Sequence, residues 1–136
     1  MSPGYLLVRV DGRPFGLPLA GVLEVADTGD VLDVPRRTPA LRGLTPARGQ
    51  LVPLVHVGAL LGHRSAPPER GRSHVLVTLS GGRIVALEVD DAEEVVREAP
   101  LPVPEGEDLP WASGVARRGA GLVPVLDLAA MEDRIR

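Results

Sequence analysis

The string with the clearest catalytic potential is Asp27-Thr28-Gly29. This triplet carries the catalytic aspartate of aspartic proteases, in which two carboxylates brought together share one proton. Two copies of a chain of this length could supply both carboxylates, so a homodimeric aspartic protease is one hypothesis. Such a triplet should follow a buried strand, whereas here Asp30 follows directly and the surrounding residues are typical of a loop. We therefore interpret the triplet as a turn.

The histidines do not have the spacing of a metal site. No two of His56, His63 and His74 are three or four residues apart, the spacing that puts two ligands on one helix face. His56 lies in an apolar stretch, which predicts a packed or hydrogen-bonded side chain. The chain has no cysteine, so thiolate ligands, disulfides and cysteine nucleophiles are excluded. We expect no metal, no cofactor and no catalytic residue, and hence a chain that is not an enzyme.

Composition narrows the class of partner. With 136 residues the chain can form one compact domain or two small lobes that share a core. A formal charge of -3 and only three aromatic residues provide neither a field for phosphates nor a stacking platform, so nucleic acid is not expected. The longest uncharged stretch, 49–62, is too short to span a bilayer, and Met1–Gly4 does not resemble a signal peptide. A cytoplasmic chain is expected, without membrane insertion.

Glycines and prolines separate short apolar stretches, which is typical of an all-β protein. Asp11-Gly12 and Arg48-Gly49 are strong signals for hairpin turns. The sequence predicts hairpins over 5–17, 44–55, 75–87 and 113–126, and single strands at 22–25 and 94–97. Helical turns are predicted at 38–43 and 58–61, with a short helix after Leu128. This spacing of glycines and prolines predicts no long helix.

The chain contains a weak internal repeat. A displacement of 71 positions places Gly43 on Gly114 and Leu51-Val52-Pro53 on Leu122-Val123-Pro124. Between the halves, 65–72 is polar and rich in proline, which predicts a linker or an exposed loop. We expect one lobe over about 1–66 and a second over about 67–136, and we leave open whether terminal strands are exchanged.

Six segments then follow one another in a specific order. They are Val22-Leu23-Glu24-Val25, Thr38-Pro39, the segment 43–49 that ends in Arg48-Gly49, the apolar segment 51–57, Leu87-Glu88-Val89-Asp90, and Val123-Pro124-Val125-Leu126-Asp127-Leu128. In order and spacing, from about Tyr5 to Met131, they resemble the CheW-like domain of bacterial chemotaxis adaptors. The chain differs from the family pattern at Pro46-Ala47, where the motif has Asn-Leu, and at His56, where it has Asp.

The resemblance implies a single CheW-like domain over 1–136, built from two five-stranded SH3-like β-barrels with a core between them. It also implies a non-enzymatic adaptor that bridges the cytoplasmic tip of a chemoreceptor to the regulatory domain of a CheA-type histidine kinase. An adaptor of a pilus-type chemosensory pathway fits the same motifs.

The partner-binding residues expected from this resemblance begin with Arg48 and Gly49, which match the motif's Arg-Gly. An arginine can offer a planar fork of donors to carboxylates or carbonyls of a partner; it can equally be a solvated residue beside a turn glycine. Glu24 is a second candidate. The segments of Val22 and Leu44 are expected to line a groove between the lobes.

Overall fold

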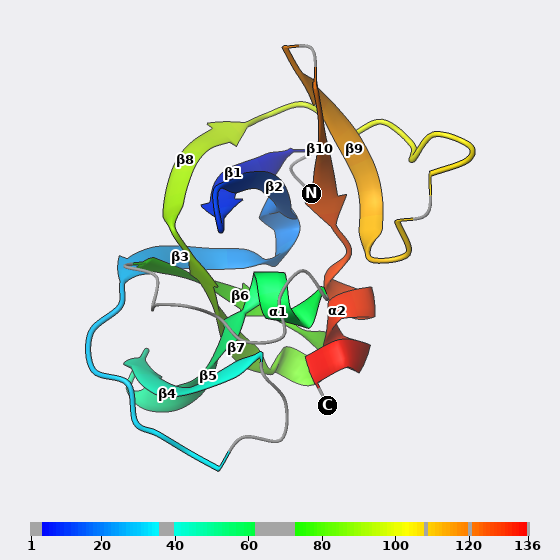
Figure 1. The fold of residues 1–136 in the computed structure, drawn as a ribbon. Coiled ribbons are helices and arrows are strands. Elements are labelled where there is room, and N and C mark those ends of the chain that lie inside the picture. The colour runs from blue at the N-terminus through cyan, green and yellow to red at the C-terminus, as the bar shows by residue number, and fades with distance from the viewer. Residues whose placement is uncertain (1–3, 36–39, 62–72, 108, 120, 136) are drawn as a thin grey trace.

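The computed structural model describes residues 4–35, 40–61, 73–107, 109–119 and 121–135. Its strands form two five-stranded sheets, one above the other in Figure 1, which we call lobe A and lobe B. Lobe A has the order β8 (Asp91–Val96), β1 (Tyr5–Val10), β2 (Arg13–Pro18), β10 (Gly121–Leu126), β9 (Ala112–Arg118). Lobe B has the order β3 (Val22–Asp27), β6 (Ser73–Thr78), β7 (Ile84–Val89), β5 (Gln50–His56), β4 (Leu41–Ala47).

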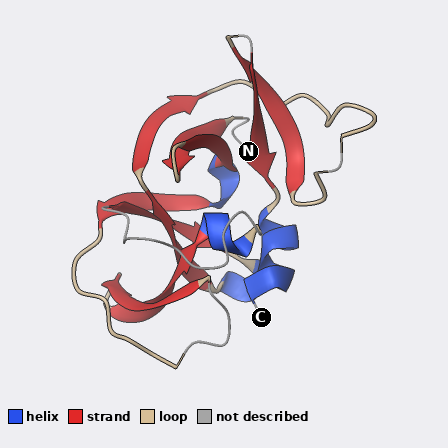
Figure 2. Ribbon diagram, in the orientation of Figure 1, coloured by secondary structure: helices blue, strands red, loops and turns tan. Residues whose placement is uncertain are grey.

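The helices are short. α1 (Val57–Leu60) follows β5 and α2 (Leu128–Ile135) follows β10, and the two contact each other beside the junction of the lobes. Two single turns, η1 (Leu19–Gly21) and η2 (Ser80–Gly82), complete the described helical structure. Strands therefore dominate the described residues, as Figure 2 shows; the predicted all-β class is confirmed in that the helices between the strands are few and short.

The predicted hairpins are present. β1 pairs with β2, β4 with β5, β6 with β7 and β9 with β10, all antiparallel. Asp11 and Arg48 both have a φ of 52°, and each precedes a glycine with a φ near 80°. Two successive positive φ values form the turn whose twist matches that of the flanking strands. Asp11-Gly12 and Arg48-Gly49 therefore set the registers of their hairpins.

Some boundaries differ from those expected. The helical turn predicted to end at Gly43 is wrong there, because Leu41–Gly43 belong to β4; Thr38 and Pro39 lie outside the described residues. The single strand predicted at 94–97 lies at Asp91–Val96. The linker predicted at 65–72 also lies outside the described residues, so the division of the chain near residues 66 and 67 stays a prediction.

Neither sheet closes on itself. β3 and β4 are the two edges of lobe B, and β8 and β9 are the two edges of lobe A. In each lobe one residue of the connecting loop makes an isolated bridge to an edge strand: Leu32 pairs with Leu44, and Leu101 pairs with Val115. The five strands expected for each lobe are confirmed, but the sheets stay open and the SH3-like barrel stays a prediction.

The internal repeat is confirmed in the register of the strands. β4 bulges so that Leu41 faces Val55 while Gly43 faces Leu54, and β9 bulges so that Ala112 faces Leu126 while Gly114 faces Val125. Each residue of the first set lies 71 positions before its counterpart in the second. The parallel pairs β5–β7 and β10–β2 also occupy equivalent places in their sheets. The two lobes are thus two copies of one sheet topology.

The main core lies between the lobes. Alternate residues of a strand face opposite sides of its sheet, so Leu6, Val8 and Val10 of β1 enter the shared core, whereas Tyr5 and Leu7 enter a smaller cluster inside lobe A. Lobe B has a matching inner cluster around Leu54, Leu76 and Ala86. Leu17, Leu87 and Leu126, from both lobes, are fully buried in the shared core. Burial between the sheets therefore holds the two lobes together as one body.

Candidate partner-binding site

The structure brings Glu24 and Arg48 together. Glu24 lies on the edge strand β3, and Arg48 lies in the turn between β4 and β5, the opposite edge of the same sheet. The guanidinium Nε donates to the Glu24 carboxylate over 2.9 Å. Because lobe B curves, its two edges approach each other, and this ion pair spans the seam between them. Gly49, beside Arg48, has the positive φ that the turn requires.

The pair is accessible to a partner. The side chains of Arg48 and Glu24 are 48% and 43% exposed, so water screens their attraction. An exposed pair of this kind contributes about 0–1 kcal/mol to folding. The contact uses one N–H of Arg48, and the guanidinium has further donors to offer. The ion pair thus contributes little to folding stability, and both side chains are accessible for contacts with a partner.

Lobe A repeats this ion pair. Arg118 is the last residue of β9, Glu94 lies on the edge strand β8, and Arg118 Nη2 contacts the Glu94 carboxylate. Glu94 faces Leu7 beside the bulge of β8, as Glu24 faces Leu76 beside the bulge of β3. A groove of about 350 Å³ opens beside this second pair, lined by Leu7, Arg9, Glu93, Glu94, Arg118 and Val123 among others. The seam ion pair is therefore a feature of the repeated topology.

Val22 and Leu44 lie in different surroundings. Val22 is half buried and packs against the shared core between the lobes. Leu44 is also half buried, but it bridges to Leu32 at the seam of lobe B. Val22 thus packs at the junction of the lobes, whereas Leu44 lies next to the loop residue Leu32; that both line a partner-binding groove stays a prediction.

The sequence motifs did not single out three exposed apolar residues near the seam. Leu23, Val25 and Leu32 are 37%, 45% and 51% exposed, and all three lie on β3 or the loop that follows it. The signal was available, because Val22-Leu23-Glu24-Val25 has apolar residues on both faces of a strand that can bury only one. An exposed apolar edge beside a pair of charges is typical of a protein-binding surface.

The Asp27-Thr28-Gly29 triplet lies at the end of an edge strand and in the loop that follows it. Asp27 is the exposed last residue of β3, an edge strand, and Thr28 and Gly29 continue into a loop. The buried strand that an aspartic protease triplet needs is therefore lacking at this position. Thr28 Oγ1 contacts His74 Nδ1 at 2.9 Å, so the hydroxyl is used in packing the loop onto β6.

His56 is buried and hydrogen-bonded, as predicted. It ends β5, and its two ring nitrogens lie 2.8 Å from a Glu88 carboxylate oxygen and 2.9 Å from an Asp11 carboxylate oxygen. Among the described residues, histidine and acidic side chains form no group of three suited to holding a metal ion. The contacts of His56 are with carboxylates, and it has a structural place at the junction of the lobes.

Two open β-sheets that share one core, with charged and apolar groups gathered along exposed edges, define a β-type scaffold or adaptor module. The chain belongs to the CheW-like domain family, whose model matches residues 4–135. Members of this family are chemotaxis scaffolds and not enzymes, which agrees with the expectation from the sequence.

The crystal structure of the scaffolding protein TtCheW from Thermoanaerobacter tengcongensis has the same fold. The two chains superpose with a TM-score of 0.80 at 18% sequence identity, over 96% of this chain and 88% of that chain. Comparison with curated proteins found no match. Within the described residues, no helix has both the length and the apolar character needed to cross a bilayer.

Proposed function

We propose that this chain is a cytoplasmic adaptor that couples the tip of a chemoreceptor to the regulatory domain of a CheA-type histidine kinase. Membership of the CheW-like family supports the scaffold role. The main support for a docking surface comes from the seam of lobe B. There the accessible Arg48–Glu24 pair lies beside the exposed apolar residues Leu23 and Val25 of the β3 edge.

The docking surface comprises the β3 edge, the Arg48-Gly49 turn, Leu44, and the border of the lobe junction at Val22. An adaptor must release and rebind, so a modest interface with a few anchors suits it. Leu23 and Val25 offer apolar area, while Arg48 and Glu24 fix the register of the partner by charge. The free edge of β3 also offers backbone donors and acceptors to a partner strand.

Calorimetric titration against the kinase regulatory domain and, separately, a receptor-tip fragment tests this proposal. Arg48→Ala should weaken binding by about 2–5 kcal/mol if the guanidinium is desolvated against a partner carboxylate or carbonyl. Arg48→Lys should restore only part of the affinity, because a lysine lacks the planar fork. Glu24→Ala should cost about 1 kcal/mol as a residue at the rim.

Arg118→Ala is the matched control. It removes the equivalent seam ion pair from lobe A, outside the proposed docking surface, so it should lose the same small stability and keep full affinity. Equal binding by wild type and Arg48→Ala would refute the site. Failure of the wild-type chain to bind either partner would refute the adaptor role.

A further inference from the structure

A cluster of ionisable side chains connects the two lobes at His56. The ring lies at the end of β5 with its side chain 4% exposed. Its Nδ1 lies 2.8 Å from Glu88 Oε1 on the neighbouring strand β7, and its Nε2 lies 2.9 Å from Asp11 Oδ2. Asp11 belongs to the β1–β2 turn of lobe A, whereas His56 and Glu88 belong to lobe B. One imidazole therefore joins the two lobes.

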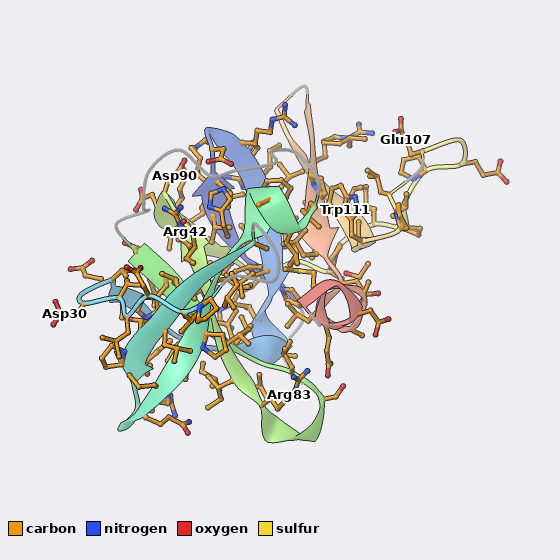
Figure 3. All side chains as sticks on the ribbon, turned by 60° about the horizontal axis from the view of Figure 1, so that its bottom comes forward. Asp30, Arg42, Arg83, Asp90, Glu107 and Trp111 are labelled. Atoms are coloured by element: carbon orange, nitrogen blue, oxygen red, sulfur yellow. The ribbon has the colours of Figure 1, made fainter. Side chains whose placement is uncertain are left out.

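Arg42 completes the cluster. It extends from β4, is labelled in Figure 3, and its Nε contacts both carboxylate oxygens of Glu88 at 3.2 and 3.3 Å. The side chains of Arg42, Glu88 and Asp11 are 7%, 1% and 14% exposed. Among the described residues, Asp11 and Glu88 are the titratable groups that contact His56, and Arg42 joins the cluster through Glu88; α1, which begins after His56, contributes none.

The donors and acceptors match only one protonation state of the ring. An ionised carboxylate can only accept hydrogen bonds, and a neutral imidazole has a single N–H. With a carboxylate at each nitrogen, both contacts are satisfied when both nitrogens carry a proton. The charges then balance, because the carboxylates of Asp11 and Glu88 face one guanidinium and one imidazolium. Removal of a ring proton leaves a lone pair facing a buried carboxylate, which is costly.

The internal repeat places His56 at the position of Asp127, but the His56 ring does not cap a helix as the Asp127 carboxylate does. His56 corresponds to Asp127, whose Oδ1 accepts the backbone N–H groups of Ala129 and Ala130 at the start of α2. His56 precedes α1 in the same way but makes no side-chain cap. Its ring points instead to Asp11, whose carboxylate lies so close to Gly58 that a Cβ there would come within 2.4 Å. The packing thus encloses the His56–Asp11 contact.

We propose that His56 is a proton-dependent latch between the two lobes. With both ring nitrogens protonated it ties Asp11 of lobe A to Glu88 of lobe B, and loss of one proton breaks one of these ties and loosens the junction. This property lies beyond the adaptor role and does not depend on it.

The direction of the titration follows from the surroundings. Burial is the largest single influence and lowers the pKa of His56, but the hydrogen bonds to Glu88 and Asp11 and the negative charges of these two groups together outweigh it, and the pKa is raised above 6.5. A raised pKa in the folded state means that the stabilisation is complete below pH 6.5 and is lost as the pH rises through the folded pKa. The latch is therefore closed in mildly acidic solution and opens toward alkaline pH.

Nitrogen-15 NMR of the ring in the full chain tests the protonation state directly. We expect both His56 nitrogens to carry protons at pH 6.5, where His74 gives a neutral ring. A neutral, single-tautomer His56 at pH 6.5 in the folded chain would overturn the proposal.

Urea unfolding between pH 6 and 9 tests the link to the junction. The folding equilibrium constant of wild type should fall by up to about tenfold per pH unit above pH 6.5 until the folded pKa is passed. Asp11→Asn should flatten this dependence, because an amide can accept from an N–H or donate to a bare nitrogen, and asparagine tolerates the positive φ at this position.

Asp90→Asn is the matched control. The Asp90 carboxylate accepts a hydrogen bond from the backbone N–H of Gly12, the residue that follows Asp11 in the β1–β2 turn. Among the described residues Asp90 has no contact with His56, so the variant should keep the wild-type pH dependence. An unchanged slope in Asp11→Asn would refute the latch, as would an equal loss of slope in Asp90→Asn.

Discussion

Two histidines are buried in lobe B, and their surroundings favour opposite protonation states. His56 faces a carboxylate at each nitrogen. His74 on β6 contacts the Thr28 hydroxyl at one nitrogen, and its buried Nε2 has no hydrogen-bond partner among the described residues. Burial lowers the pKa of His74, and the nearby carboxylates of Glu24 and Asp27 only partly oppose this. In its charged form, His74 would hold a buried Nε2–H for which the described residues offer no acceptor.

His74 should therefore destabilise the chain in acid. Between its lowered pKa and 6.5 the unfolded chain binds a proton that the folded chain does not, so stability falls as the pH drops through this range. His74→Asn, which removes the titrating ring and keeps a polar group that can hydrogen-bond the Thr28 hydroxyl, should remove a fall of up to about tenfold in the folding constant per pH unit. Urea unfolding at pH 5, 6 and 7 measures the difference from wild type. Parallel curves for the two chains would contradict the assignment.

The side-chain pairings were only partly predictable from the sequence. Arg48 and Glu24 were each picked out by a motif, yet their mutual contact depends on the curvature of lobe B, which brings two distant edges together. The prediction of a hydrogen-bonded His56 followed from its apolar neighbours. Its partners Asp11 and Glu88 could not be found in that way, because they come from a different lobe and a different strand.

Among the strands and turns, the glycines at the two bulges of β4 and β9 leave no space for a side chain. A Cβ on Gly43 would lie 2.4 Å from the carbonyl oxygen of Leu32, and one on Gly114 would lie 2.6 Å from that of Leu101. These carbonyls belong to the isolated bridges that join each connecting loop to an edge strand. Gly43 also has a φ of 147°, which strains any other residue. Each glycine lets a loop approach the open side of its sheet.

Alanine at either bulge should therefore lower the free energy of unfolding. We expect a loss on the order of 1–3 kcal/mol for Gly114→Ala from the clash alone, and a larger loss for Gly43→Ala, where the φ adds strain. Gly29→Ala is the control, because a Cβ there meets nothing within 4 Å, and it should change stability by less than about 0.5 kcal/mol. Urea unfolding of the three variants ranks them. A Gly114→Ala chain as stable as Gly29→Ala would show that the loop can move away freely.

Strands were predicted well where turn residues marked them. Asp11-Gly12 and Arg48-Gly49 fixed two hairpins because few residues accept two positive φ values in succession. Thr38-Pro39 carried a local helix-start signal that extended to Gly43, but pairing of Leu41 with Val55 places Leu41–Gly43 in β4 instead. Long-range pairing, absent from any local pattern, decided the structure there.

In the molecule as a whole, one core serves both lobes. Leu17 of lobe A and Leu87 of lobe B are both fully buried in it, and Phe15 packs against Trp111 with ring centroids 6.1 Å apart at its border. A core shared in this way couples the lobes, so each should lose its structure when the other does.

The substitution Leu87→Ala in lobe B should therefore also destabilise lobe A. We expect it to lower the free energy of unfolding by about 2–5 kcal/mol, and the fluorescence of Trp111, the single tryptophan, should shift to the same midpoint as the far-ultraviolet circular dichroism. Leu122→Ala, at a side chain 48% exposed, is the control and should cost far less. Separate midpoints for the two signals in Leu87→Ala would mean that the lobes unfold independently.

The order of the strands along the chain has a consequence for synthesis. Lobe B is continuous from Val22 to Val89, whereas lobe A takes β1 and β2 from before this segment and β8, β9 and β10 from after it. On the ribosome, the first hairpin emerges long before the strands that flank it, and its apolar face has lobe B as its earliest partner. Lobe B can assemble while the last strands of lobe A are still being translated. The growing chain therefore completes lobe A only after lobe B has formed.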